Sequence, residues 1–399
     1  MPTSVVLPQS RPTPSPADTP APPRPVGYFE RTLPPALILG TFFAVTLPMA
    51  ALVRWADTGV VVWVYLWLFG MTHFVLTLTV YMQSGNLRHF AATWRNRLYF
   101  FAVPVGLFIA FDLLHAFRVG ATFPVFALWF WGAVRLLDFN HFNRQSFGVY
   151  QLFKARTGVR FPAGLKRTED AFFAALTVLL FATFLGGGLC PLLQPGGWLT
   201  VADVGRGLAD PVLPLDVLQA ATVVGVAAAV GLLSASVTGL VRAWRAAGRP
   251  AGLAMALTYL AFQAASAVLA VVSFPLYIAS LAIHYVEYHV LMAPRCFRSR
   301  LDEASRLDRF YGRVRANRVL FYAAVVVIAG LVTVLAAAGM GVMGRYPGVF
   351  AEPVGYLVLI ALFDGLFVFH YFVEMLIWRF SDPYFRQSRA GLYFAPKPA

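Results

Sequence analysis

Long apolar segments alternate with short polar connections from about residue 33 to about residue 378. A membrane crossing takes about 20 apolar residues in a helix. The apolar run 252–293 would make one helix about twice as long as the hydrocarbon core is thick, so we divide it at Ser273-Phe274-Pro275. The pattern then predicts an all-α, polytopic membrane protein with ten transmembrane helices, over residues 33–53, 60–82, 98–117, 121–137, 171–193, 217–241, 252–272, 273–293, 319–341 and 354–378.

The basic residues fall in every second connection between these segments. Most of the arginines and lysines lie in residues 83–97, 138–170, 242–249, 294–318 and the C-terminal region. The other connections hold one basic residue or none, and 194–216 is acidic. Short cytoplasmic loops carry an excess of lysine and arginine. Ten spans with both termini in the cytoplasm satisfy this rule at every connection.

Composition supports an integral membrane protein, for which a bacterial-type inner membrane is our expectation. Hydrophobic residues make up 59% of the chain and charged residues 13%, whereas soluble domains contain about 45–50% and 25%. The net charge of +14 lies in short loops, so we expect no nucleic-acid partner. Cys190 and Cys296 are predicted on opposite sides of the bilayer, so we expect no disulfide between them, and there is no zinc-type cysteine cluster.

Three regions follow from these patterns. Residues 1–27 are rich in proline, serine and threonine and are predicted to form a disordered tail. Residues 28–380 are predicted to form the helical bundle, and 381–399 a cytoplasmic C-terminal tail. The segment 140–150 is predicted as a polar loop. It would either close over a site and bind an anionic head group through Arg144, or form a surface loop anchored by its aromatic residues.

Ionisable residues inside the predicted spans are the main candidates for function, because charged groups at membrane depth are costly and rare. The predicted topology places six of the seven histidines in the cytoplasmic half, and His115 is the exception. The ionisable groups gather at three places. These are His284, Glu287 and His289 in the stretch 283–292; Asp364, His370 and Glu374 in span 354–378; and Arg135, Asp138 and His141 at the end of span 121–137.

Helical spacing predicts which of these side chains share a face. His370 and Glu374 are four residues apart, and Asp138 and His141 are three apart, so each pair lies on one face. His284 and Glu287 share a face in the same way. His289 lies about 140° around the helix from His284, so we expect it to point elsewhere.

Imidazoles and carboxylates that converge from several helices form ligand sets for transition metals. One or two iron ions are our first expectation, with zinc, manganese and copper as open alternatives; haem ligation by paired histidines and purely structural polar contacts are further alternatives. A single membrane histidine is also a common interhelical hydrogen-bond partner, and this structural interpretation competes for His73 and His115, whereas His89 is interpreted as an interfacial loop residue. Glu287, Glu374 and Asp138 are the candidate acid/base groups. The candidate metal ligands are His73, His141, His284, His289, His370, Glu287 and Glu374.

The stretch Tyr285-Val286-Glu287-Tyr288-His289 resembles the tyrosine–x–glutamate–histidine signature of membrane alkane hydroxylases, with Tyr288 inserted before the histidine. These enzymes belong to the histidine-motif di-iron family that includes fatty acid desaturases. The HxxxH and HxxHH boxes of that family do not occur in this chain. The resemblance implies iron-dependent oxidation of a lipophilic substrate.

Two functions are compatible with these observations. The first is a membrane non-haem iron oxygenase, desaturase or hydroxylase that acts on a lipid, hydrocarbon or isoprenoid from the cytoplasmic leaflet, with a redox partner. The second is a proton-coupled transporter that uses the same residues as a relay. The grouping of the ionisable residues in one leaflet favours the enzyme. So does the lack of a pair of glycine- or proline-broken spans marking inverted halves.

Overall fold

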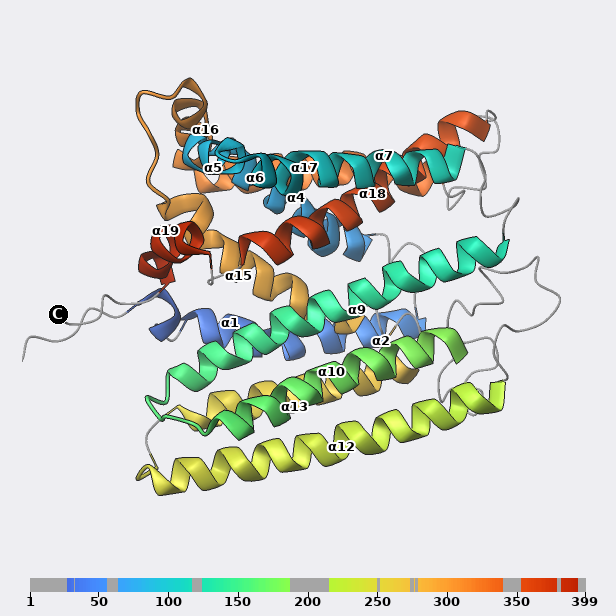
Figure 1. The fold of residues 1–399 in the computed structure, drawn as a ribbon, viewed down its shortest axis with the longest axis vertical. Helices are drawn as coiled ribbons and strands as arrows, with labels where there is room; N and C mark the ends of the chain where they lie inside the picture. The colour runs from blue at the N-terminus through green and yellow to red at the C-terminus, as the bar shows by residue number, and fades with distance from the viewer. Residues whose placement is uncertain are drawn as a thin grey trace, which may run out of the picture.

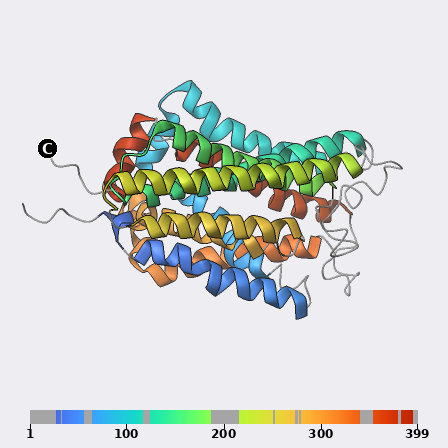
Figure 2. The same cartoon turned by 90° about the horizontal axis from the view of Figure 1, so that it is seen from below.

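Helices account for nearly all of the regular structure. The computed structural model describes residues 27–31, 33–55, 64–116, 124–186, 215–249, 252–272, 276, 279–339, 353–378 and 382–393. Within these ranges there is no strand, which confirms the all-α class. The long helices lie side by side along a common direction (Figures 1 and 2). The predictions for the tail before Gly27, for Cys190, and for the side chains of His115 and Asp364 lie outside the described residues.

The N-terminal half of the chain forms the following elements. They are η2 (Tyr28–Glu30), α1 (Leu33–Thr41), η3 (Phe42–Thr46), α2 (Leu47–Trp55), η4 (Leu66–Met71), α4 (Thr72–Leu78), η5 (Thr79–Met82), α5 (Ser84–Ala91), α6 (Trp94–Arg97), η6 (Leu98–Ala102), α7 (Val103–Ala116), α9 (Pro124–Ala155) and α10 (Ala163–Gly186). The C-terminal half contains α12 (Leu215–Ala246), α13 (Leu253–Val272), α15 (Ala282–Arg298), α16 (Arg306–Ala316), α17 (Arg318–Gly339), α18 (Pro353–Ile377) and α19 (Pro383–Tyr393).

Each of the ten apolar ranges predicted from the sequence contains helix. Among the described residues, three helical stretches are long and apolar enough to cross a membrane: Leu33–Leu52, Ala220–Ala246 and Leu253–Val271. A fourth is possible where α16 and α17 meet at a bend of 101°. The number of crossings and the side on which the termini lie therefore stay predictions.

Helix α9 corrects the expected loop at residues 140–150. It continues without a break to Ala155, well beyond the predicted end at Leu137. Phe139, Tyr150 and Phe153 are buried along this extension. Asn143 and Ser146 are buried on the same face and lower the hydropathy. Two further regions predicted as loop and tail also hold helices, α16 and α19.

The described basic connections gather at one end of the bundle. Helices α5, α6, α16 and α19 lie at the left of Figure 1, together with the turns that follow α9 and α12. Ser305 caps α16, and the buried Asp308 accepts hydrogen bonds from the Ser84 backbone, at 2.6 Å, and the Asp302 backbone, at 2.7 Å. This network fixes α16 across the start of α5.

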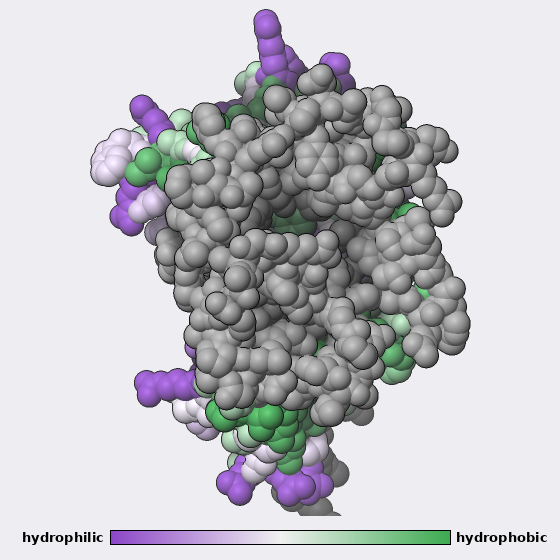
Figure 3. Space-filling model, turned by 90° about the vertical axis from the view of Figure 1, so that its right-hand side faces the viewer, coloured by the Kyte–Doolittle hydropathy of each residue, from purple (hydrophilic) through white to green (hydrophobic). Residues whose placement is uncertain are grey.

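The flanks of the bundle are apolar. Val223, Val224 and Val230 of α12 are 56%, 67% and 57% exposed, and hydrophobic residues gather at the lower edge of the molecule in Figure 3, where α12 lies. Leu331 of α17 is 61% exposed. Inside the bundle, α10 packs against both α9 and α12, and α18 packs against α7, α17 and α4. Apolar flanks of this kind suit a lipid environment.

A buried ion pair joins α9 to α10 near the basic end. The Lys154 ammonium lies 2.8 and 2.6 Å from the two carboxylate oxygens of Glu169, and the two side chains are 4% and 0% exposed. Tyr150 donates a further hydrogen bond of 2.8 Å to Glu169, and Lys154 lies 4.6 Å from the centre of the Phe161 ring. Each of the two buried charges therefore has a partner of opposite charge.

We expect Glu169→Gln to destabilise the fold by about 3–5 kcal/mol, because it leaves the Lys154 charge buried without an anion. The double variant Lys154→Met/Glu169→Leu is expected to recover much of that loss. The measurement is the unfolding midpoint of the detergent-purified protein. The control is Arg88→Gln, which breaks the exposed ion pair between Arg88 and Asp302 at 2.9 Å. In that pair the hydrogen bond from Arg88 lowers the pKa of Asp302. If Arg88→Gln lowered the unfolding midpoint as much as Glu169→Gln does, the importance of burial for the Lys154–Glu169 pair would be contradicted.

Candidate metal centre

Three histidines and one glutamate from three separate helices converge inside the bundle. They are His73 of α4, His141 of α9, and His370 and Glu374 of α18. Their exposed fractions are 0%, 8%, 0% and 2%. One ligand atom from each lies within 4.8 Å of all the others. We call these four residues the His/Glu cluster.

Short contacts between ring nitrogens and carboxylate oxygen define the geometry of the cluster. The Nε2 atoms of His73 and His370 are 2.6 Å apart. The Nε2 atom of His141 lies 2.9 Å from Glu374 Oε2, and His370 Nε2 lies 3.7 Å from the same oxygen. Three imidazole nitrogens and one carboxylate oxygen therefore point at a common position.

The protein does not satisfy all of these polar atoms by itself. Among the described residues, His73 Nδ1 is buried without a hydrogen-bond partner, and the buried His141 Nε2 has the carboxylate oxygen of Glu374 as its neighbour, although buried polar groups are normally paired. Two Nε2 lone pairs that face each other repel unless one nitrogen carries a proton or a cation lies between them. Three imidazoles and a carboxylate form a ligand set for a divalent transition metal such as iron, zinc or manganese. The four residues of the cluster therefore fit a metal ion, whose identity the ligand set does not determine.

A hydroxyl pair holds the ring of His370. Thr77 Oγ1 lies 2.6 Å from His370 Nδ1 and 2.6 Å from the Tyr288 hydroxyl. When His370 donates its Nδ1–H to Thr77, its Nε2 keeps a free lone pair directed at the cluster. Metal-binding histidines generally have their second ring nitrogen fixed in this way.

The sequence around His73 helps to explain its position. The π-helical segment η4 ends at Met71, two residues before His73. An irregular turn of this type changes the direction in which the following side chains point, and such turns often occur at functional sites. Thr77 is one helical turn after His73, so α4 supplies both a candidate ligand and the group that orients another.

His284 lies beside the His/Glu cluster without being one of its four members. Its ring centre is 4.9 Å from that of His73 and 5.3 Å from that of His141. It is 5% exposed, and its Nδ1 has no hydrogen-bond partner. A small cavity of about 20 Å³ next to it is also lined by Asn143 and Gln263.

Glu287 takes part in a different network. Its carboxylate accepts hydrogen bonds from Tyr259, from Ser146 at 3.2 Å, from Gln145 at 3.4 Å and from Gln263 at 3.5 Å. It is fully buried. The structure thus separates Glu287 from the other predicted carboxylate, Glu374, and uses it to connect α15 to α9 and α13.

The remaining predicted residues lie around the cluster or away from it. Asp138 accepts a hydrogen bond of 2.6 Å from Tyr371, whose ring packs 4.8 Å from that of His141, so Asp138 reaches the cluster through Tyr371. His289 lies 3.2 Å from Thr72 Oγ1, outside the cluster. His89 stacks on Tyr384 and lies 3.6 Å from Asp382 at the basic end.

Sequence reasoning did not single out the hydroxyl and ring partners Thr77, Tyr259, Tyr371 and Trp378. Thr77 had a usable signal, because it lies one turn from His73 on the same helix. The Trp378 indole donates a hydrogen bond of 3.1 Å to Glu374 Oε1, one turn back along α18. Tyr259 and Tyr371 had no such signal, since their partners are on other helices.

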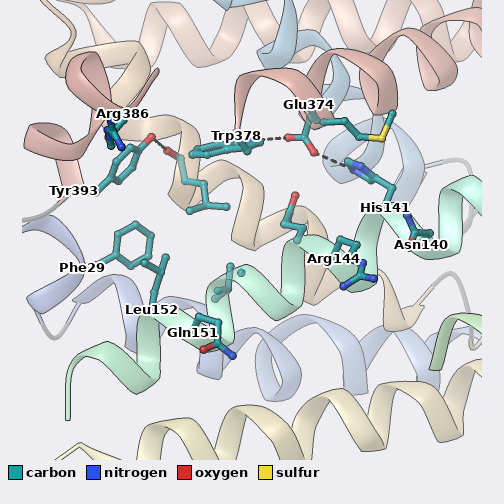
Figure 4. A pocket seen from close by; sticks show the side chains of 15 residues that line it. Phe29, Asn140, His141, Arg144, Gln151, Leu152, Glu374, Trp378, Arg386 and Tyr393 are labelled. Atoms are coloured by element: carbon teal, nitrogen blue, oxygen red, sulfur yellow. Dashed lines mark hydrogen bonds and ion pairs between the residues drawn. The ribbon is translucent and has the colours of Figure 1, made fainter. Parts of the chain in front are cut away.

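A cavity of about 690 Å³ leads up to the cluster. Figure 4 shows His141 and Glu374 at one end of it, Phe29, Arg386 and Tyr393 at the other, and Trp378 between them. Its volume is typical of small-molecule sites. Val149, Leu152, Leu291 and Met375 supply apolar parts of its wall.

Comparison of the chain with protein families, with curated proteins and with solved structures gives no match.

We expect Thr77→Val to lower metal affinity about 10- to 100-fold, because it removes the hydroxyl that orients His370 while preserving the shape of the side chain. The measurement is competition with a chromophoric chelator on the purified protein. The matched control is Thr333→Val, where the hydroxyl bonds only to its own helix at Ala329. Equal affinities for the two variants would contradict the role given to Thr77.

Proposed function

We propose that this chain is an integral-membrane, metal-dependent enzyme, most closely a non-haem iron oxygenase, hydroxylase or desaturase acting on a lipophilic substrate. The observation that carries the proposal is the His/Glu cluster at the inner end of a largely apolar cavity. A buried ligand set that meets a cavity is the arrangement that a catalytic metal requires, because substrate must reach an open position beside the ion.

Each residue near the cluster has a role in this proposal. His73, His141, His370 and Glu374 would hold the metal. Thr77 and Tyr288 orient His370, and Trp378 orients Glu374. Tyr371 packs against His141 and is itself held by Asp138. These contacts fix the ring and carboxylate directions.

A bound iron ion would supply the reactivity toward dioxygen that oxidation of an unactivated C–H bond requires, with electrons from a redox partner. The protein's own contribution is to position the substrate and to exclude water. The apolar part of the cavity wall does both, since Val149, Leu152 and Leu291 offer contacts to a hydrocarbon and no hydrogen bonds from their side chains.

Membrane integration through several helices is part of the proposal. It is supported by the three long apolar helices, by the exposed valines of α12 and by the collection of basic connections at one end of the bundle. In that arrangement the basic end faces the cytoplasm, and the cluster lies within the bilayer's cytoplasmic half.

A proton-coupled transporter is the second candidate. It is favoured by the close approach of titratable groups, since Glu374 Oε2 lies 2.9 Å from His141 Nε2 and 3.7 Å from His370 Nε2. Such a chain can pass a proton between helices without a metal. The large cavity beside the cluster favours the enzyme.

Elemental analysis of the detergent-purified protein tests the proposal. We expect stoichiometric iron in the wild type, and its loss in His370→Ala and in Glu374→Ala, because each variant removes one of four ligands. His289→Ala is the matched control: it removes a half-buried histidine outside the cluster and should keep the metal.

Folding of each variant is checked by size-exclusion chromatography and circular dichroism. A folded wild-type protein that binds no stoichiometric metal would overturn the metalloenzyme proposal. Proton flux measured in liposomes would then test the transporter.

A further inference from the structure

The large cavity is elongated along α9. The α9 residues that line it recur at intervals of three and four, from His141 through Gln145 and Gly148 to Leu152, so they form one face of the helix. At 1.5 Å per residue this face is about 16 Å long. A ligand that fills the cavity is therefore extended along the helix and not compact.

The cavity opens between two helices. Besides Arg386 of α19, the exposed lining residues are Arg144 and Gly148 of α9 and Met375 of α18, and Met375 is 49% exposed. The opening thus lies along the side of the bundle, where a ligand dissolved in the bilayer could enter without crossing the polar end.

The end of the cavity far from the His/Glu cluster carries positive charge. Arg386 of α19 lines it there, beside Tyr393 (Figure 4), and within the described part of the chain its guanidinium has no carboxylate at ion-pair distance. Behind the cavity wall, Arg295 packs 4.7 Å over the ring of Trp378, is 4% exposed, and its Nη2 has no hydrogen-bond partner among the described residues.

The other arginine at the cavity is different, because Arg144 is paired with Asp170. The uncompensated positive charge therefore belongs to the end formed by α19, where Arg386 is exposed. A guanidinium group without a carboxylate partner favours an anionic ligand group.

We propose that this cavity binds a single-chain amphiphile with one anionic end, whose charged group lies against Arg386 and whose hydrocarbon chain extends along α9 to His141 and Glu374. The inference rests on the proposed function, which it deepens by fixing the direction in which the substrate lies. The metal centre would then face the hydrocarbon chain of the ligand, far from its charged group.

Binding of radiolabelled palmitate and of hexadecanol, which share a chain length and differ in charge, tests this orientation on the full-length purified protein. We expect Arg386→Gln to weaken palmitate binding about tenfold and to leave hexadecanol binding unchanged. The matched control is Arg167→Gln, which removes an exposed arginine of α10 outside the cavity.

Gly148→Phe tests the location. A Cβ at Gly148 meets no atom within 4 Å, so the helix accepts the substitution and the ring enters the opening of the cavity. We expect both ligands to lose binding. Gly231→Phe, at an equally open glycine on α12, is the control and should bind both as the wild type does.

The outcomes separate the inference from the proposed function, because metal content is measured on every sample. If wild type and Arg386→Gln bound palmitate equally, Arg386 would not be the partner of the anionic group. If Gly148→Phe bound both ligands as the wild type does, the cavity would not be the binding site. Preference for a two-chain phosphatidic acid over palmitate would overturn the single-chain ligand. Palmitate binding that follows our expectations in a protein without metal would support the ligand site and overturn the metalloenzyme.

Discussion

The constraint on which the structure depends is that polar side chains inside an apolar bundle must be paired, since each unpaired group costs several kcal/mol in a medium without water. The bundle meets it by contacts between helices that are distant in sequence. His73 of α4 meets His370 of α18, His141 of α9 meets Glu374 of α18, and Lys154 of α9 meets Glu169 of α10. These pairs fix the relative rotation of the helices, which apolar contacts alone specify poorly. At the His/Glu cluster the paired groups are themselves metal-ligand types, so a metal ion is the expected further partner.

The two buried glutamates Glu287 and Glu374 differ in how their carboxylate oxygens are paired. Glu287 accepts hydrogen bonds from four neutral side chains of α9 and α13, so both its oxygens are occupied and it acts as a connection between helices. Glu374 receives one hydrogen bond, from Trp378 to Oε1, while Oε2 faces His141 and His370. One oxygen of Glu374 is thus held in place and the other is free for a metal. Residue type and burial are the same for the two glutamates, and only the neighbours distinguish them.

Much of the helical fold follows from the sequence, because runs of about 20 apolar residues have few alternatives. Part of the site follows too: the spacing of His370 and Glu374 predicts their shared face, and the angle at His289 predicts that it points away. The sequence did not predict that His284 and Glu287 would lie in different networks. Residues three apart differ by about 60° around a helix, which is enough for one to face the cluster and the other to face α13. The extension of α9 was missed for a related reason, since side chains such as Asn143 and Ser146 are polar yet buried, and a hydropathy pattern counts them as loop.

The His/Glu cluster has a closed side and an open side. His73 and His370 are fully buried, and His370 is held from behind by Thr77 and Tyr288. His141 and Glu374 belong both to the cluster and to the wall of the large cavity. A ligand in the cavity can therefore approach the cluster from one direction only. Structural metal sites are closed by protein ligands on every side, whereas catalytic sites keep one position accessible. The placement of two ligands in a cavity wall is thus a stronger argument for catalysis than the identity of the four residues, because the same four side chains in a sealed core would serve only to hold the helices together.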